Sequence, residues 1–176
     1  MTQFTLGLDA STKTVGYACT DQATKTILDC GFVDISKLEK NKDKTFHFIK
    51  AMEEKPWLKN VTAINVEAAL SGFGGGKTSQ QVIIMLSRFS AVFCYIIEEH
   101  YKIEPCLANA TTMRKQLFGK ARIKGVKPKD YVRNEIEKRF DLSPWVVLNR
   151  NKEPDVRMDD VRDAVVAGFY SAPPVK

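Results

Sequence analysis

The order of short apolar segments is the feature that most limits how this chain can fold. Three such segments lie within the first 35 residues, separated only by turn-forming stretches, which is typical of an antiparallel meander. Strand-like apolar runs then alternate with segments of helical periodicity, the pattern of β-α-β crossovers. We expect strands at 4–8, 15–19, 27–33, 61–69 and 103–109, and helices at 45–55, 79–100, 111–118, 128–140 and 159–172.

This order, β-β-β-α-β-α-β-α-α-α, predicts an α/β fold with a mixed five-stranded sheet and helices on both faces. The length of 176 residues is that of one ordinary domain. The sequence contains no internal repeat and no linker-like composition. We therefore expect a single domain over residues 1–176.

Four carboxylates occupy positions from which they can converge. Asp9 ends the first expected strand, Glu67 ends an apolar run, and Asp160 and Asp163 share one face of the last helix at a spacing of i, i+3. Four neighbouring carboxylates repel one another strongly, so such a cluster requires divalent cations. Each acid alone also fits an ordinary structural role, and Asp159 also reaches the face of Asp163, at i, i+4. Together they predict a site where two Mg²⁺ ions hold a scissile phosphate.

Positive charge is concentrated in residues 114–139. This segment holds ten lysines and arginines against three acids, a net charge of +7, whereas the rest of the chain has a net charge of −1. A local basic patch suits binding to a phosphate backbone, because each neutralised phosphate releases a condensed counterion. A solvated surface helix with a loop is the alternative interpretation of the same charges.

Three motifs resemble those of the RuvC-type Holliday-junction resolvases. They are the run LGLDASTKTVGYA at 6–18, the strand INVEAAL at 64–70 and the helix DDVRDAVVAG at 159–168. The resemblance extends between them, through a glycine-bearing loop, a long apolar helix, a short helix with Met113-Arg114-Lys115 and a helix begun by Pro128. It therefore covers nearly the whole chain.

The resemblance implies an RNase H-like fold and a homodimer that cuts two opposed strands of a four-way DNA junction. It places Asp9, Glu67, Asp160 and Asp163 at the catalytic, metal-binding positions, with two Mg²⁺ ions per site and Mn²⁺ able to substitute. Arg114 and Lys129 match positions that bear basic, DNA-contacting residues. The expected DNA-binding residues are Lys13, Phe73, Lys77, Arg114, Lys115, Lys120, Arg122, Lys124 and Lys129.

The loop SGFGGGKT at 71–78 departs from the family pattern by its many glycines. Phe73 is its only aromatic residue, a candidate wedge for the junction centre, and Lys77 with glycine amides could contact DNA phosphates. The loop also nearly fits a nucleotide-binding phosphate loop, but Ser71 stands where that motif has its first glycine. An ATPase and a non-catalytic DNA-binding module are therefore the alternative functions.

The segment 82–97 is apolar at 13 of its 16 positions. A helix that is apolar nearly all round must be covered on most sides, so we expect a core helix that also forms a subunit interface. Phe93 is the residue that we expect on its exposed side. Arg88 and the short length argue against a membrane span.

The four cysteines show no metal-binding spacing and suit reduced core thiols. The first twelve residues lack the basic and apolar regions of a signal peptide. We therefore expect a cytoplasmic protein, in a bacterial cell or in the cytoplasm of a phage-infected host.

Overall fold

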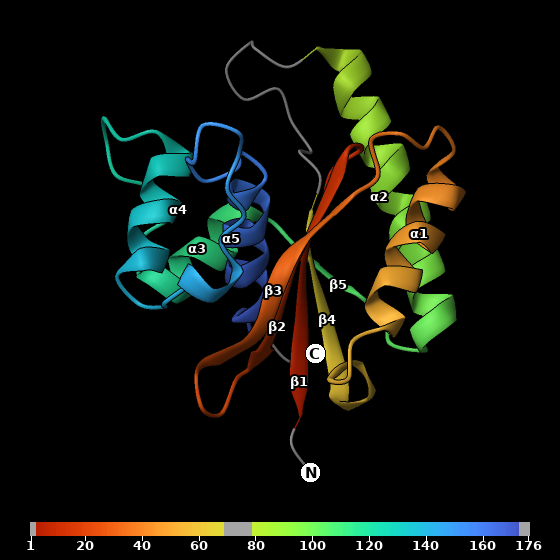
Figure 1. The fold of residues 1–176 in the computed structure, drawn as a ribbon, viewed down its shortest axis with the longest axis horizontal. Coiled ribbons are helices and arrows are strands. Elements are labelled where there is room, and N and C mark those ends of the chain that lie inside the picture. Colours follow the sequence, from red (N-terminus) through yellow and green to blue (C-terminus); the bar gives the residue numbers. More distant parts are fainter. Residues whose placement is uncertain (1–2, 69–78, 173–176) are drawn as a thin grey trace.

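The computed structural model of the chain describes residues 3–68 and 79–172 (Figure 1). Five strands form one sheet in the order β3-β2-β1-β4-β5. The strands are β1 Phe4–Ala10, β2 Thr14–Asp21, β3 Thr26–Asp34, β4 Val61–Glu67 and β5 Cys106–Ala108. β1, β2 and β3 pair antiparallel, whereas β4 is parallel to both β1 and β5. The predicted mixed five-stranded sheet is therefore confirmed.

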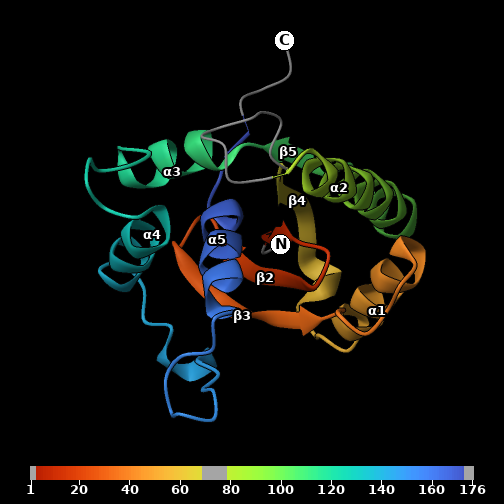
Figure 2. The same cartoon turned by 90° about the horizontal axis from the view of Figure 1, so that it is seen from above.

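Helices cover both faces of this sheet, as predicted. Figures 1 and 2 show α1 and α2 together on one face and α3, α4 and α5 on the other. The helices are α1 Asn41–Glu53, α2 Gln80–Tyr101, α3 Ala110–Phe118, α4 Pro128–Glu137 and α5 Met158–Gly168. Each face has its own hydrophobic core, one between the sheet and α1 with α2, the other centred on α5. That residues 1–176 make a single domain stays a prediction.

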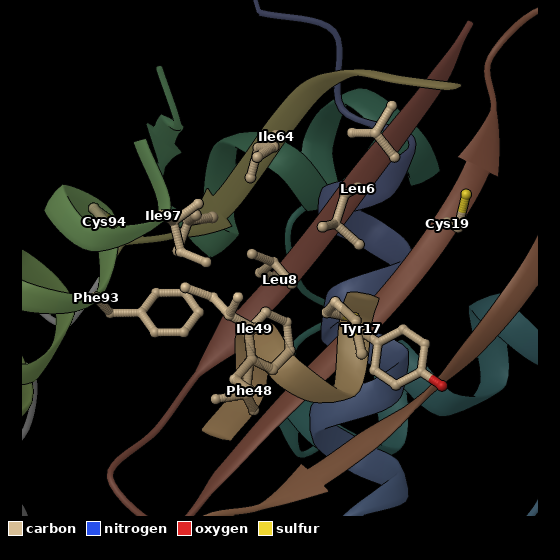
Figure 3. Close-up of a cluster of buried hydrophobic side chains, with 14 of the residues drawn as sticks. Leu6, Leu8, Tyr17, Cys19, Phe48, Ile49, Ile64, Phe93, Cys94 and Ile97 are labelled. Carbon is tan, nitrogen blue, oxygen red and sulfur yellow. The ribbon is translucent and has the colours of Figure 1, made fainter. Parts of the chain in front are cut away.

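The core under α1 and α2 is built from large side chains (Figure 3). Phe93 lies at its centre and is fully buried, with its ring centroid 5.4 Å from that of Phe48 and 5.6 Å from that of Phe89. The expectation that Phe93 lies on the exposed side of its helix is therefore wrong. Helix α2 is rotated so that Phe89, Phe93 and Ile97 face the sheet, since this brings three apolar side chains into one stripe.

The opposite side of α2 carries apolar side chains that nothing in the described chain covers. Val82, Ile84, Met85 and Tyr95 are exposed, Tyr95 at 65%. By length and composition alone, α2 could also cross a membrane, and 28% of its apolar window is buried. The same composition occurs in core helices of soluble proteins, and the packing of Phe93 assigns α2 to the core on one side.

Helix α1 begins earlier than expected, at Asn41 instead of Thr45. The polar residues before Thr45 join the helix because Lys44 is buried and its Nζ donates a hydrogen bond of 2.6 Å to the Thr12 carbonyl. Phe46 was expected to face inward with Ile49 and Met52. It is exposed, and Phe48 takes its place in the core.

Helix α5 approaches the sheet far more closely than α2 does, because glycines line its path. A Cβ atom at Gly7 would lie 2.1 Å from the Gly168 nitrogen, and one at Gly16 would lie 2.3 Å from the Asp160 carbonyl oxygen. At its far end, α5 is held by Asn65, whose Nδ2 donates to the Ala167 carbonyl at 2.9 Å. The backbone of α5 is thereby held against β1 and β2.

Candidate active site

Asp9 and Glu67 lie side by side at one edge of the sheet. β1 and β4 are parallel neighbours in which Leu8 pairs with Val66, so the next residues, Asp9 and Glu67, reach the same edge. The turn that follows Asp9 is held by Ser11, whose hydroxyl donates to the Thr14 carbonyl at 2.9 Å. The carboxyl ends of parallel strands thus bring the two acids together, as the sequence predicted.

Asp160 and Asp163 reach the same place from the first turns of α5. Gly16 pairs with Asp9 across β1 and β2, and the missing side chain of Gly16 leaves room for the Asp160 backbone. The start of α5 is therefore held next to Asp9. The structure brings together all four acids that the sequence singled out.

The pKa values of the four acids record this crowding. Burial, followed by the charges of Glu67, Asp163 and Asp160, raises the pKa of Asp9 well above its usual value. Burial and the Asp163 charge raise the pKa of Glu67 to about 7, and burial raises the pKa of Asp160 to about 6. The pKa of Asp163 is also raised, chiefly by burial, although Arg114 opposes the shift. Uncompensated carboxylates in a sheltered site have this signature.

The geometry distinguishes Asp160 from Asp159. The Asp159 carboxylate turns toward α4, where Lys129 Nζ lies 3.2 Å away and Arg133 Nη2 lies 3.4 Å away. Arg162 Nη1 approaches the same carboxylate at 3.3 Å. Asp160, not Asp159, is among the charges that raise the pKa values of Asp9 and Glu67.

Arg114 is the one cation whose side chain enters the cluster within the described chain. Its Nη2 donates a 2.7 Å hydrogen bond to Asp163 Oδ1, and both side chains are about 85% buried, at 15% and 14% exposure. Sequence analysis expected a DNA-contacting residue at this position. The structure places it against a carboxylate of the site instead.

The donor set fits hard divalent cations such as Mg²⁺, which prefer carboxylate oxygens. Glu67 Oε2 is buried and meets no hydrogen-bond partner among residues 3–68 and 79–172, so it is available as a ligand. Across the same residues, no three histidine, cysteine, aspartate or glutamate side chains already stand in a metal-binding arrangement. Small side-chain movements are therefore needed before the four acids could hold a metal ion.

The remaining expected DNA-binding residues divide into three groups. Lys115, Lys120, Arg122 and Lys124 are exposed on α3 and the loop after it. Lys13 and Lys129 line a surface cavity of about 370 Å³ that also includes Asp160. Phe73 and Lys77 lie outside the described residues, as does the loop on which the ATPase alternative depends.

Two residues near the site were missed by sequence analysis. Lys44 fastens the turn after Asp9, but nothing in the polar stretch around it indicates that contact. Arg157 lines the cavity beside Asp160, stacks 4.4 Å from the centre of the Phe32 ring and pairs with Asp34 at 3.0 Å. Its position just before the Asp159-Asp160 pair is the only sequence signal that could have identified it.

Comparison with known proteins finds similar solved structures. The Thermus thermophilus RuvC structure matches with a TM-score of 0.60 and 12% identity, over 95% of this chain and 92% of that one. T. thermophilus RuvC in complex with Holliday junction substrate gives 0.59 and 10%, over 95% and 90%. The yeast mitochondrial Holliday junction resolvase Ydc2 gives 0.61 and 15%, over 96% and 78%. No protein-family model and no curated protein sequence matches the chain.

These structures confirm that the chain has the RuvC-type, RNase H-like fold that the three motifs predicted. The likeness extends over nearly the whole chain. At identities of 10–15% it establishes the fold alone.

Proposed function

We propose that this chain is a metal-dependent, structure-selective DNA endonuclease that resolves four-way junctions, and other branched DNA, by paired nicks. The observation that carries the proposal is the convergence of four carboxylates at one edge of an RNase H-like sheet. They come from β1, β4 and α5, and their raised pKa values indicate that they await a cation. The RuvC structure that contains a Holliday junction substrate supports this class of DNA.

Asp9, Glu67, Asp160 and Asp163 would hold two Mg²⁺ ions, for which Mn²⁺ could substitute. Bound Mg²⁺ would supply Lewis acidity, which activates water and stabilises charge on the leaving oxygen. Glu67 contributes a carboxylate whose pKa near 7 lets it hold a proton at Oε2 until a cation is bound. The chain thereby avoids four uncompensated negative charges in one sheltered site.

The residues around Asp160 would position the DNA strand. Lys13, Lys129 and Arg157 line the cavity of about 370 Å³ next to this carboxylate, so three cationic side chains can hold phosphates there. In the hydrolysis, a water oxygen bonds to phosphorus as the bond to the 3′ oxygen breaks. The products are a 5′-phosphate and a 3′-hydroxyl.

Paired nicks require two sites, and we propose that a homodimer supplies them. The exposed apolar side of α2, with Val82, Ile84, Met85 and Tyr95, is the surface that a second copy would cover. Because Phe93 is buried, the test of this interface is Tyr95→Asp. Sedimentation should show a dimer for the parent and a folded monomer for the variant. A folded parent that stays monomeric at micromolar concentration would refute the interface.

The test of the proposed activity is cleavage of synthetic DNA in Mg²⁺. Four-way junctions should be cut in preference to three-way, flapped and linear duplex DNA. Asp9→Asn, Glu67→Gln and Asp163→Asn should each lose several kcal/mol of transition-state stabilisation, about a thousandfold in rate. Junction binding should persist or tighten, because each change removes negative charge near phosphates.

Asp130→Asn is the matched control, since this acid is exposed on α4. It should cut at the parent's rate. Comparison of Asp159→Asn with Asp160→Asn tests the assignment within the pair, and only the second should lose cleavage. Full Mg²⁺-dependent activity in Asp9→Asn would refute the site. A parent that binds junctions without cutting them would be a non-catalytic DNA-binding module.

A further inference from the structure

The carboxylates near the start of α5 have very different counter-ions. Asp159 is paired with Lys129, Arg133 and Arg162, at distances of 3.2 to 3.4 Å. Within residues 3–68 and 79–172, neither Asp9, Glu67 nor Asp160 forms an ion pair, and Asp163 has Arg114 alone. The chain therefore neutralises the neighbour of the site with three cations and leaves the site itself with one.

Arg114 is held in this position by charge more than by a complete set of hydrogen bonds. Its Nη2 meets Asp163, but its buried Nε has no partner in the described part of the chain. Burial disfavours a charged guanidinium, yet the charges of Asp163, Glu67 and Asp9 raise the pKa of Arg114. A guanidinium with an unsatisfied Nε is bound less firmly than one that makes its full set of bonds.

We propose that Arg114 is the resident counter-cation of the metal-free site, and that divalent metal binding displaces it from Asp163. The inference rests on the metal site of the proposed function. As long as Arg114 Nη2 occupies Asp163 Oδ1, this oxygen is not free to bind a metal ion. This explains why four converging acids show no ready-made metal-binding arrangement.

Displacement has a second consequence for Arg114. Once the metal neutralises the acids, the long side chain on α3 is free to reach a DNA phosphate, the partner that the sequence indicated for it. Arg114 would then act on cleavage as a positioning residue, first for the empty site and afterwards for DNA. Metal binding and DNA binding would favour each other through this one side chain.

The experiment is calorimetric titration of the full chain with Mg²⁺ at about pH 8.5, where proton competition for the carboxylates is reduced. Arg114→Gln removes the competing charge and should tighten the dissociation constant by about tenfold, since a charge-assisted hydrogen bond is no longer broken. The metal-free variant should also melt at a lower temperature than the parent. Arg114→Lys, which keeps the charge, should bind Mg²⁺ more weakly than Arg114→Gln.

Arg133→Gln is the matched control. It removes the same charge from a partner of Asp159, outside the cluster, and should leave Mg²⁺ affinity unchanged. Equal affinity in the parent and a folded Arg114→Gln would overturn the inference while leaving the metal site standing. No Mg²⁺ binding by the parent or by any variant would overturn both.

A second measurement on the unaltered chain covers the case in which Arg114→Gln does not fold. The ¹⁵N signal of Arg114 Nε, assigned through its loss in Arg114→Lys, should shift during Mg²⁺ titration with the calorimetric midpoint. The signal of Arg133 should stay in place. An Arg114 signal that does not move while Mg²⁺ binds would overturn the displacement.

Discussion

The two faces of the sheet are packed in opposite ways. On one face, Phe48, Phe89 and Phe93 fill a thick aromatic layer that holds α2 away from the strands. On the other face, Gly7 and Gly16 let the backbone of α5 touch the backbone of the sheet. The first face is a stack of side chains, and the second is a contact between main chains.

This difference assigns different tasks to the two faces. A layer of large side chains provides burial, and its detailed shape can adjust when one member changes. A contact between main chains cannot adjust, so it determines the position of Asp160 and Asp163 relative to Asp9. We therefore expect changes on the α2 face to lower stability, and changes on the α5 face to misplace the site.

The largest expected effect on stability is on the aromatic face. Phe93→Ala should lower the free energy of unfolding by about 3–5 kcal/mol, because it empties the centre of a fully buried cluster. Urea unfolding measures this loss. Glu98→Ala, at an exposed position of the same helix, is the control and should change stability by about 0.5 kcal/mol or less. If both changes cost the same, the aromatic layer would not carry the stability of this face.

A smaller loss of stability with a larger loss of function is expected on the glycine face. Gly16→Ala places a methyl group against the Asp160 backbone and should cost about 1–3 kcal/mol in urea unfolding. Junction cleavage should fall further than this loss explains, because Asp160 moves away from Asp9. Gly125→Ala lies in open space at a positive φ and should cost about 1 kcal/mol without loss of cleavage. A fully active Gly16→Ala would break the distinction between the faces.

The acids on the α5 side should make the metal-free protein less stable as the pH rises. The pKa values of Glu67, about 7, and Asp160, about 6, lie above those of the unfolded chain, so the unfolded state loses its protons first. Each group therefore lowers the free energy of unfolding by up to about 1.4 kcal/mol per pH unit between its unfolded and its folded pKa. Urea unfolding in chelator from pH 5 to 7 measures the slope.

Glu67→Gln is the control for that slope. It removes the Glu67 contribution and should make stability fall less steeply with pH than in the parent. Asp155, whose pKa is lowered to about 2 by hydrogen bonds from Arg157, acts in the opposite direction, but only at pH values near and below 4. Equal slopes in the parent and Glu67→Gln would mean that Glu67 is not a crowded acid in the folded protein.

The smallest expected effect concerns the DNA surface on the α3 and α4 side. Lys120→Ala with Lys124→Ala should make the slope of log K against log[salt] shallower by up to about two units, at about 0.9 per phosphate. Lys42→Ala with Lys50→Ala, exposed on α1, should leave the slope unchanged. A salt titration of junction binding measures both pairs. Equal slopes for the two pairs would place the DNA path elsewhere.

Much of the architecture followed from local patterns in the sequence. Alternating apolar residues predicted the meander, and the apolar run before Glu67 predicted a buried strand, because each pattern reports burial within one segment. Strand ends also placed Asp9 and Glu67 correctly, since parallel neighbours share an edge. The helix starting near Thr111 is begun instead by Asn109, whose side chain accepts a hydrogen bond from the Thr112 nitrogen.

The sequence by itself determined which elements form, their order, and which acids stand at strand ends and near the start of the last helix. Only the tertiary structure decided that Phe93 faces inward, that Asp160 and not Asp159 joins the cluster, and that Arg114 pairs with Asp163. The physical reason is that these three facts depend on how each helix is rotated and how closely it approaches the sheet. Contacts between distant segments, such as Gly16 with Asp160, set that rotation and distance, and no local pattern records them.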